Sequence, residues 1–151
     1  MRPALDVGLT VPAAAAASRA RELAACGVDG LFTFEGPHDV FFPLVAAALA
    51  GIEIDLYTNV AIAFPRSPFH LAQQGREMQD LAGGRFALGL GTQVRAHIER
   101  RYSARWESPV TRMAELVGLL QAIWQAWETG GTVDHRGRHY RLDLLPPVFR
   151  P

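Results

Sequence analysis

A carboxylate and an imidazole lie three residues apart in the segment Glu35-Gly36-Pro37-His38-Asp39. At a buried strand end, such a pair could bind or protonate a polar heterocycle, because both groups can donate or accept a proton. The alternative is structural, since an aspartate in front of Phe41-Phe42-Pro43 also suits the cap of a helix. We assign Asp39 to the cap and retain Glu35 and His38 as candidate acid/base residues.

A second candidate is the segment Gly89-Leu90-Gly91-Thr92-Gln93. Its glycines would let backbone amides approach a phosphate, and a helix beginning just after it would add its dipole. Basic residues follow at once: Arg95, His97, Arg100 and Arg101. The third glycine of a dinucleotide fingerprint is missing, and an arginine-rich loop is also typical of a solvated face. Both readings remain open at this point.

Strand-like and helix-like segments alternate around these candidates. We expect strands over residues 5–9, 30–34, 55–63 and 85–90, and helices over residues 13–25, 43–50 and 69–81. This alternation is typical of βα units that build a parallel sheet. The strands are almost continuously apolar, as a parallel sheet covered on both faces requires.

The carboxyl ends of parallel strands gather at one rim, where function is found in a (β/α) barrel. The unusual residues of this chain follow the expected strands: Thr10 and Pro12; Glu35, His38 and Asp39; residues 59–66; and Gly91, Thr92 and Gln93. Loops after strands are commonly polar and rich in Gly and Pro, so any single loop could be ordinary. Four such loops in succession favour a site.

After residue 93 the alternation of strand-like and helix-like segments ends. A polar, arginine-rich stretch leads to a long helix over residues 109–128, with Arg112 and Glu115 expected on its wetter side, and then to a hairpin that turns at Arg136-Gly137. His135 and His139 flank that turn, and the glycine between them argues against a metal pair. We predict no metal site.

Composition excludes several classes of function. The 151 residues contain 15 Arg and no Lys, so neither Schiff-base chemistry nor a P-loop is available. One cysteine, Cys26, excludes an intrachain disulfide, and we expect it to be a small buried group. The formal net charge is zero, so the chain as a whole lacks the positive charge typical of proteins that bind nucleic acid or an anionic membrane surface. We expect one cytoplasmic domain without a targeting signal.

Five motifs together carry a resemblance to a known family. They are Gly-Leu-Thr-Val-Pro (8–12), Glu-Gly-Pro-His-Asp (35–39), Ala-Phe-Pro-Arg-Ser-Pro (63–68), Leu-Ala-Gly-Gly-Arg-Phe-Ala-Leu-Gly-Leu-Gly-Thr-Gln (81–93) and Arg-Gly-Arg-His-Tyr-Arg-Leu (136–142). This combination resembles the luciferase-like monooxygenase superfamily. Residues 88–102 are similar to its F420-dependent oxidoreductases rather than to the FMN luciferases.

The resemblance implies a (β/α)8 barrel that binds a deazaflavin at the carboxyl ends of its strands. It implies a non-prolyl cis peptide at Asn59–Val60, or one residue later, in a bulge backing the cofactor. The residues that it assigns to cofactor binding are Thr10, Asn59, Val60, Ala61, Gly91, Thr92, Gln93 and Arg95. It also places Glu35 and His38 beside the deazaflavin ring. Some members carry a glutamate just after the strand-four Gly-Thr, where this chain has Gln93.

The implied activity is hydride transfer between F420 and an organic substrate, with FMN-dependent monooxygenation as an alternative. Such a barrel needs about 250 residues, so we expect residues 1–151 to be its N-terminal half, with strands one to four in residues 1–93 and an insertion in residues 94–151. The isolated chain is then expected to bind F420 weakly or not at all. A homo-oligomer or a separate C-terminal half would cover the open sheet. A non-catalytic half-barrel that serves in assembly is a further alternative.

Overall fold

The computed structural model describes residues 4–151, which form two compact units. Unit 1 comprises residues 4–61 and 77–91, and unit 2 comprises residues 62–76 and 92–151. One helix, α3 (Pro68–Leu81), contributes residues to both units. Its first turn is capped, because the amide of His70 donates to the hydroxyl of Ser67 at 3.1 Å.

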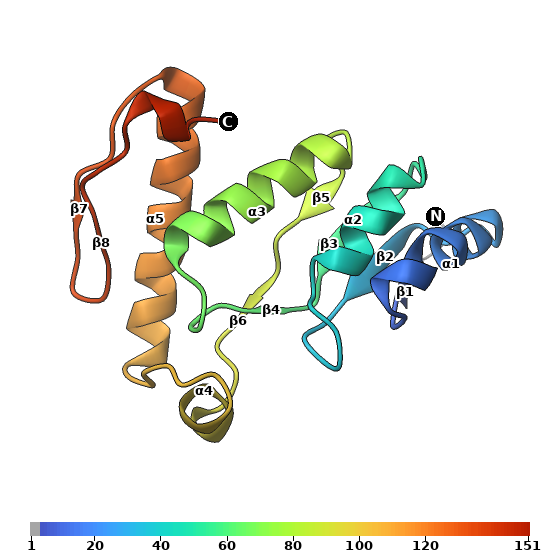
Figure 1. Ribbon diagram of the computed structural model, residues 1–151, viewed down its shortest axis with the longest axis horizontal. Coiled ribbons are helices and arrows are strands. Elements are labelled where there is room, and N and C mark those ends of the chain that lie inside the picture. The colour runs from blue at the N-terminus through green and yellow to red at the C-terminus, as the bar shows by residue number, and fades with distance from the viewer. Residues whose placement is uncertain (1–3) are drawn as a thin grey trace. The chain divides into compact units, whose positions relative to one another are not determined.

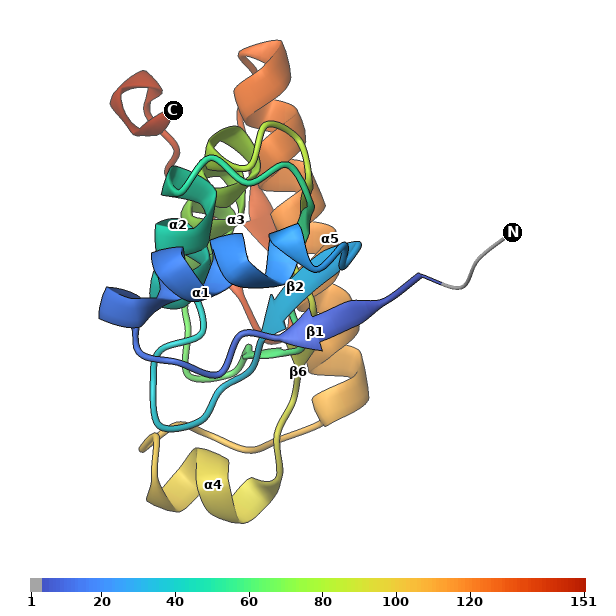
Figure 2. The ribbon, with the colours of Figure 1, turned by 90° about the vertical axis from the view of Figure 1, so that its right-hand side faces the viewer.

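Unit 1 is built on a parallel sheet of four short strands in the order β1-β2-β3-β5. These are β1 (Asp6–Gly8), β2 (Gly30–Thr33), β3 (Asp55–Thr58) and β5 (Phe86–Ala87). Figure 2 shows β1 and β2 side by side, running in the same direction. One row across the sheet consists of Val7, Leu31, Leu56 and Phe86.

Two helices cover the face of the sheet on which Leu31 and Leu56 are buried. They are α1 (Ala13–Ala25) and α2 (Phe42–Leu49), which lie side by side in Figure 1. Small residues such as Ala16, Ala20 and Ala47 are buried there and let the helices approach closely. The opposite face carries the stacked rings of Phe32 and Tyr57, 5.6 Å apart.

The third and fourth predicted strands are each divided in two. Residues 55–63 form β3 and β4 (Ala61–Ile62), and residues 85–90 form β5 and β6 (Leu90–Gly91). Between β3 and β4 lies a cis peptide bond at Asn59–Val60, at the position that the family resemblance implies. The carbonyl of Gly89 accepts hydrogen bonds from the Thr58 hydroxyl at 2.7 Å and the Ala61 amide at 2.8 Å. These bonds join the two broken strands.

Unit 2 is organised around α5 (Pro109–Thr129), which is preceded by the short α4 (Arg95–Arg100). The hairpin of β7 (His135–Arg136) and β8 (Arg141–Leu142) is antiparallel, as predicted, and runs alongside α5 in Figure 1. A 3-10 turn, η1 (Pro147–Phe149), follows. The buried residues of α5 are Leu116, Leu119, Leu120, Ile123 and Ala126.

The bounds of α1, α2, α3 and α5 were predicted to within one residue at each end, since Gly and Pro punctuate these helices, whereas no bounds were predicted for α4. Cys26 is exposed rather than buried, because it lies in the turn that ends α1 at Gly27, where φ is 78°. Within residues 4–151, no helix combines the length and the apolar character needed to cross a bilayer.

Candidate functional site

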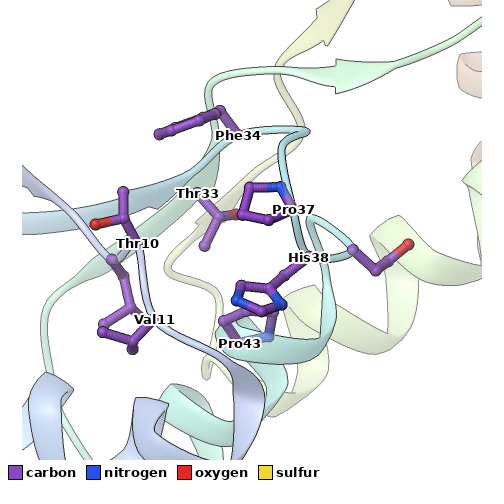
Figure 3. A pocket seen from close by; sticks show the side chains of 9 residues that line it. Thr10, Val11, Thr33, Phe34, Pro37, His38 and Pro43 are labelled. Carbon is purple, nitrogen blue, oxygen red and sulfur yellow. The ribbon is translucent and has the colours of Figure 1, made fainter.

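A small pocket lies at the carboxyl ends of β1 and β2 in unit 1. Its lining consists of Leu9, Thr10, Val11, Thr33, Phe34, Pro37, His38, Asp39 and Pro43. Figure 3 shows Thr10 and Val11 on one side and His38 with Pro43 on the other. The volume is about 30 Å³, so the pocket admits a water-sized group, and a larger ligand would lie across its mouth.

The loop that carries the acid/base candidates is fixed at both ends. The buried hydroxyl of Thr33 donates to the carbonyl of Val40 at 2.6 Å. Asp39 Oδ1 accepts the amide of Phe41 at 2.8 Å, a turn that precedes α2. Asp39 therefore has the structural role expected, although the N-cap position itself is Phe41. Between these anchors Glu35 is half-buried and His38 is exposed.

Close backbone packing marks the ends of β3 and β6. A Cβ atom on Gly89 would overlap the carbonyl of Thr58, and one on Gly91 would overlap the side chain of Val60. Glycine is therefore required at both positions for the two segments to lie in contact. The exposed Asn59 and the half-buried Val60 lie at this edge, and Ala61 is buried behind them.

The seven predicted site residues of unit 1 lie at the ends of strands or in the loops between them, and all but Ala61, the first residue of β4, lie at or after a carboxyl end. They are Thr10, Glu35, His38, Asn59, Val60, Ala61 and Gly91. Of these, Thr10 and His38 line the same pocket. No group of three or more His, Cys, Asp or Glu side chains among residues 4–151 is arranged to hold a metal ion.

The remaining three predicted residues, Thr92, Gln93 and Arg95, belong to unit 2. Gln93 has a φ of 60°, and its Oε1 accepts the amide of Val94 at 3.0 Å. That amide is thus already hydrogen-bonded within the loop. The hydroxyl of Thr92 donates to the carbonyl of Gln93 at 3.1 Å.

Sequence reasoning missed a groove beside this loop. It has a volume of about 740 Å³ and is lined by Thr92, Gln93, Val94, Arg95, Trp106, Pro109, Val110, Met113 and Ala114. The signal in the sequence was the apolar content of residues 106–114, which directly follow the arginine-rich stretch. Val110 is 80% exposed, so this turn of α5 is not covered by the core of its unit.

Glu115 is also placed differently from the prediction. Its carboxylate accepts the amides of Arg138, His139 and Tyr140 at 2.8–3.1 Å, and its Oε1 lies 3.1 Å from His135 Nε2. Burial alone would raise the pKa of Glu115, but the hydrogen bonds from His135 and the hairpin amides outweigh it and lower the pKa to about 2. Glu115 is a structural anchor with its side chain only 15% exposed.

Arg112, the other residue expected on the wet face of the helix, joins three segments of unit 2. Its guanidinium donates to the carbonyl of Arg105 at 2.6 Å, to the carbonyl of Phe64 at 3.3 Å and to the hydroxyl of Tyr140 at 3.0 Å. It also lies over the ring of Phe64, 4.3 Å from the ring centroid. This residue therefore organises the unit and does not line its groove.

Comparisons with known proteins agree with the fold. The family model described as luciferase-like monooxygenase matches residues 2–151. An uncharacterized protein of Mycobacterium tuberculosis is 42% identical over 97% of this chain and 43% of its own length. Another protein of that organism, provisionally named a coenzyme F420-dependent oxidoreductase, is 31% identical over 78% of this chain and 33% of its own length.

Among solved structures, the oxygenating constituent of 3,6-diketocamphane monooxygenase from Pseudomonas putida, in complex with FMN, superposes with a TM-score of 0.78. The match covers 97% of this chain and 45% of that one at 15% identity, so it bears on the fold alone. The chain spans less than half the length of the relatives it matches. The predicted fold class is confirmed: α/β, with parallel strands that match the N-terminal part of a luciferase-like TIM barrel and do not close it within residues 4–151.

Proposed function

Because this chain belongs to the luciferase-like monooxygenase family, we propose that it provides the cofactor-binding edge of an oxidoreductase. The reaction proposed is hydride transfer between coenzyme F420 and an organic substrate. The provisional name of the relative at 31% identity supports F420. A bound deazaflavin would supply the redox chemistry, and the protein would supply position, exclusion of water and proton transfer.

The observation that carries this proposal is the glycine-lined contact between residues 58–60 and 89–91. A flat ring needs a backing surface without protruding side chains and polar groups around its edge. The missing Cβ atoms at Gly89 and Gly91 leave a backbone layer directly against Thr58 and Val60. The exposed Asn59 adds a side-chain amide beside that layer. These residues fit a flavin or deazaflavin ring.

Thr10, Asn59, Val60, Ala61 and Gly91 are proposed to contact the cofactor. Thr10 and Asn59 have exposed polar side chains that can hydrogen-bond to a polar ring edge, whereas Val60 and Ala61 supply apolar surface. This division of roles is the one expected for a ring with apolar faces and a polar perimeter.

Glu35 and His38 are proposed to hold and move the proton that accompanies hydride transfer. The fixed loop between Thr33 and Val40 limits where these two side chains can lie, which favours proton transfer in a defined geometry. His38 is the exposed member and borders the pocket with Thr10. We assign it proton exchange with solvent, and we assign the half-buried Glu35 to orienting the reacting group.

The loop formed by Thr92, Gln93 and Arg95 is proposed to contact the phosphate-bearing tail of the cofactor. Arg95 is exposed and lies 3.9 Å from Glu99, a surface ion pair that costs little to separate. Its guanidinium could therefore turn to a phosphate, with which it can form two parallel hydrogen bonds.

FMN is the second candidate cofactor, favoured by the FMN bound to the Pseudomonas putida monooxygenase of the same fold. The backbone layer at Gly89 and Gly91 would suit either ring, because the two share a flat tricyclic shape. A third reading, a non-catalytic half-barrel that serves in assembly, is favoured by the half-exposed Phe32 and Tyr57 on the uncovered sheet face. The expected partners are a second copy or a separate C-terminal half. A cytoplasmic location stays a prediction.

Parallel titrations of the full chain with F420 and FMN, followed by the fluorescence of each cofactor, test the proposal. We expect F420 to bind at least about tenfold more tightly than FMN, a difference of about 1.4 kcal/mol. The ratio is informative even when both affinities are weak. The opposite ratio favours the FMN reading. No binding of either favours the assembly module only when the chain also forms a monodisperse species of twice its own mass.

Two variants test whether cofactor binding depends on the close packing at residue 91. Gly91→Val should abolish binding, because its side chain would occupy the space of Val60. Gly118→Val is the matched control, since nothing lies within 4 Å of a Cβ at that helical position. Equal losses in both variants would argue against the assigned surface.

A further inference from the structure

The groove of unit 2 has the composition of a small-molecule site. Its volume of about 740 Å³ lies within the usual range of about 300–1,000 Å³. Six of its nine lining residues are apolar: Val94, Trp106, Pro109, Val110, Met113 and Ala114. Val94 is 55% exposed and Val110 is 80% exposed. Apolar side chains gathered around one hollow, unlike scattered surface valines, indicate a surface that a ligand covers.

The polar lining residues are close together in the chain and rich in donors: Thr92 and Gln93 lie in the loop after β6, and Arg95 is the first residue of α4. Arg95 has donors only. The Oε1 atom of Gln93 accepts the amide of Val94, so its NH₂ group is the part that remains for a ligand. None of the nine lining residues carries a carboxylate. The polar side of the groove is therefore suited to an oxygen acceptor and unsuited to a cation.

We propose that this groove binds the apolar body of the organic substrate and that Gln93 and Arg95 hold a carbonyl or carboxylate oxygen at its polar side. The inference rests on the proposed function only in identifying the ligand as the substrate. The chemistry of the ligand is inferred from the groove alone. Thr92, Gln93 and Arg95 belong to both proposals.

Trp106 supplies a direct signal for occupancy. Its ring packs edge-to-face against Phe64, with centroids 5.7 Å apart, while its half-buried side chain also lines the groove. Trp124 and Trp127, on the later turns of α5, do not line it. A ligand in the groove should therefore change the emission of Trp106, and Trp106→Phe should remove that response while keeping the groove apolar.

The first experiment titrates the full chain with three probes that share a phenylalkyl body. These are 5-phenylpentan-2-one, 4-phenylbutanoate and 4-phenylbutylamine, measured by tryptophan emission and by calorimetry. The ketone and the carboxylate should bind, and the ammonium should bind at least about tenfold more weakly. The ratio between the ketone and the carboxylate then identifies which oxygen group is preferred. An ammonium that binds as tightly as the carboxylate would overturn the proposal.

The second experiment uses a pair of matched substitutions. Val110→Glu introduces a carboxylate into the groove at the second residue of α5, where a negative charge suits the helix dipole and does not oppose folding. Val148→Glu makes the same change at a valine that is 81% exposed in η1, away from the groove. The first should weaken 4-phenylbutanoate binding about tenfold or more, and the second by less than about twofold. Equal effects would refute the site.

These measurements need no cofactor, so they separate the two proposals. Probe binding that perturbs Trp106, with FMN binding more tightly than F420, supports the groove and contradicts the proposed hydride transfer with F420. Cofactor binding with no response of Trp106 to any probe retains the proposed function and removes the groove.

Discussion

The two units handle polar side chains in opposite ways. In unit 1 they lie at the carboxyl ends of strands, where Thr10, His38 and Asn59 are exposed. In unit 2 the carboxylate of Glu115 and the guanidinium of Arg112 are engaged by hairpin and loop backbone. The first arrangement leaves polar groups available to a ligand. The second uses them to fix a hairpin and a loop that have little core of their own.

This contrast distinguishes polar groups that can bind a ligand from polar groups that stabilise the fold. A buried charge with several hydrogen bonds is costly to remove, because the partner groups lose their acceptor or donor. An exposed polar group at a strand end contributes little to stability and can be substituted without unfolding. We therefore expect stability to respond to Glu115 and Arg112, and ligand binding to respond to the exposed residues at the strand ends.

The largest effect should follow Glu115→Gln. The amide cannot accept all the bonds made by Arg138, His139 and Tyr140, so we expect a loss of about 3 kcal/mol. Hydrogen exchange of the amides of residues 138–140 reports it directly. Glu128→Gln, on the exposed side of the same helix, should change stability by less than about 0.5 kcal/mol. Comparable losses in the two variants would remove the anchor role of Glu115.

Acid should weaken unit 2 selectively. The pKa of Glu115 is lowered from 4.5 in the unfolded chain to about 2 in the folded protein. The ionised carboxylate therefore contributes its full stabilisation above pH 4.5, and this contribution is lost as the pH falls towards 2. Protection of the hairpin amides should therefore decrease between about pH 4.5 and pH 2. Glu115→Gln should flatten this dependence. A wild-type profile that matches the variant's would contradict the assigned pKa.

A glycine substitution tests the backbone packing of unit 1. Gly89→Ala places a methyl group on the carbonyl of Thr58, and we expect a loss of about 2 kcal/mol in chemical denaturation. Gly118→Ala, in open space on α5, should instead stabilise by about 0.5–1 kcal/mol. The opposite signs distinguish close packing from a general effect of replacing glycine. A neutral Gly89→Ala would show that residues 58 and 89 can separate freely.

The smallest effect concerns the uncovered face of the unit 1 sheet. The Tyr57 hydroxyl donates to Asp6 Oδ2 at 2.8 Å, and burial together with this hydrogen bond raises the pKa of Tyr57 to about 12. Stability from this group is present below its unfolded pKa of 10.0 and lost as pH rises towards 12. Tyr57→Phe should cost about 1 kcal/mol or less at neutral pH and remove that alkaline dependence. An unchanged alkaline profile in the variant would exclude this bond.

Local patterns predicted most of the helices and the parallel arrangement. The alanine-rich run before Gly27 gave α1 its observed bounds, because propensity and the terminating glycine agree there. The local pattern did not predict the break between β3 and β4, since Asn59 to Ile62 reads as continuous strand. Only the family resemblance implied a bulge at Asn59–Val60. It depends on the carbonyl of Gly89, which lies about thirty residues further along the chain.

The sequence predicted that the candidate residues lie at strand ends, but it did not predict which of them come together. Parallel strands alone indicated that Thr10 and His38 lie at strand ends, whereas their shared pocket depends on how the loop after β2 folds. Helical periodicity predicted that Glu115 faces solvent. It could not show that Glu115 binds the hairpin amides, because those amides lie more than twenty residues later in the chain. Long-range backbone contacts leave no periodic signal in the sequence.

The outermost strands of the sheet are also its shortest. β1 has three residues and β5 has two, against four each in β2 and β3. A neighbouring chain that added itself at either margin would find few free amides and carbonyls, which discourages fibril-like growth. Whatever covers this sheet would therefore gain more from the ring surfaces of Phe32 and Tyr57 than from extending the ladder.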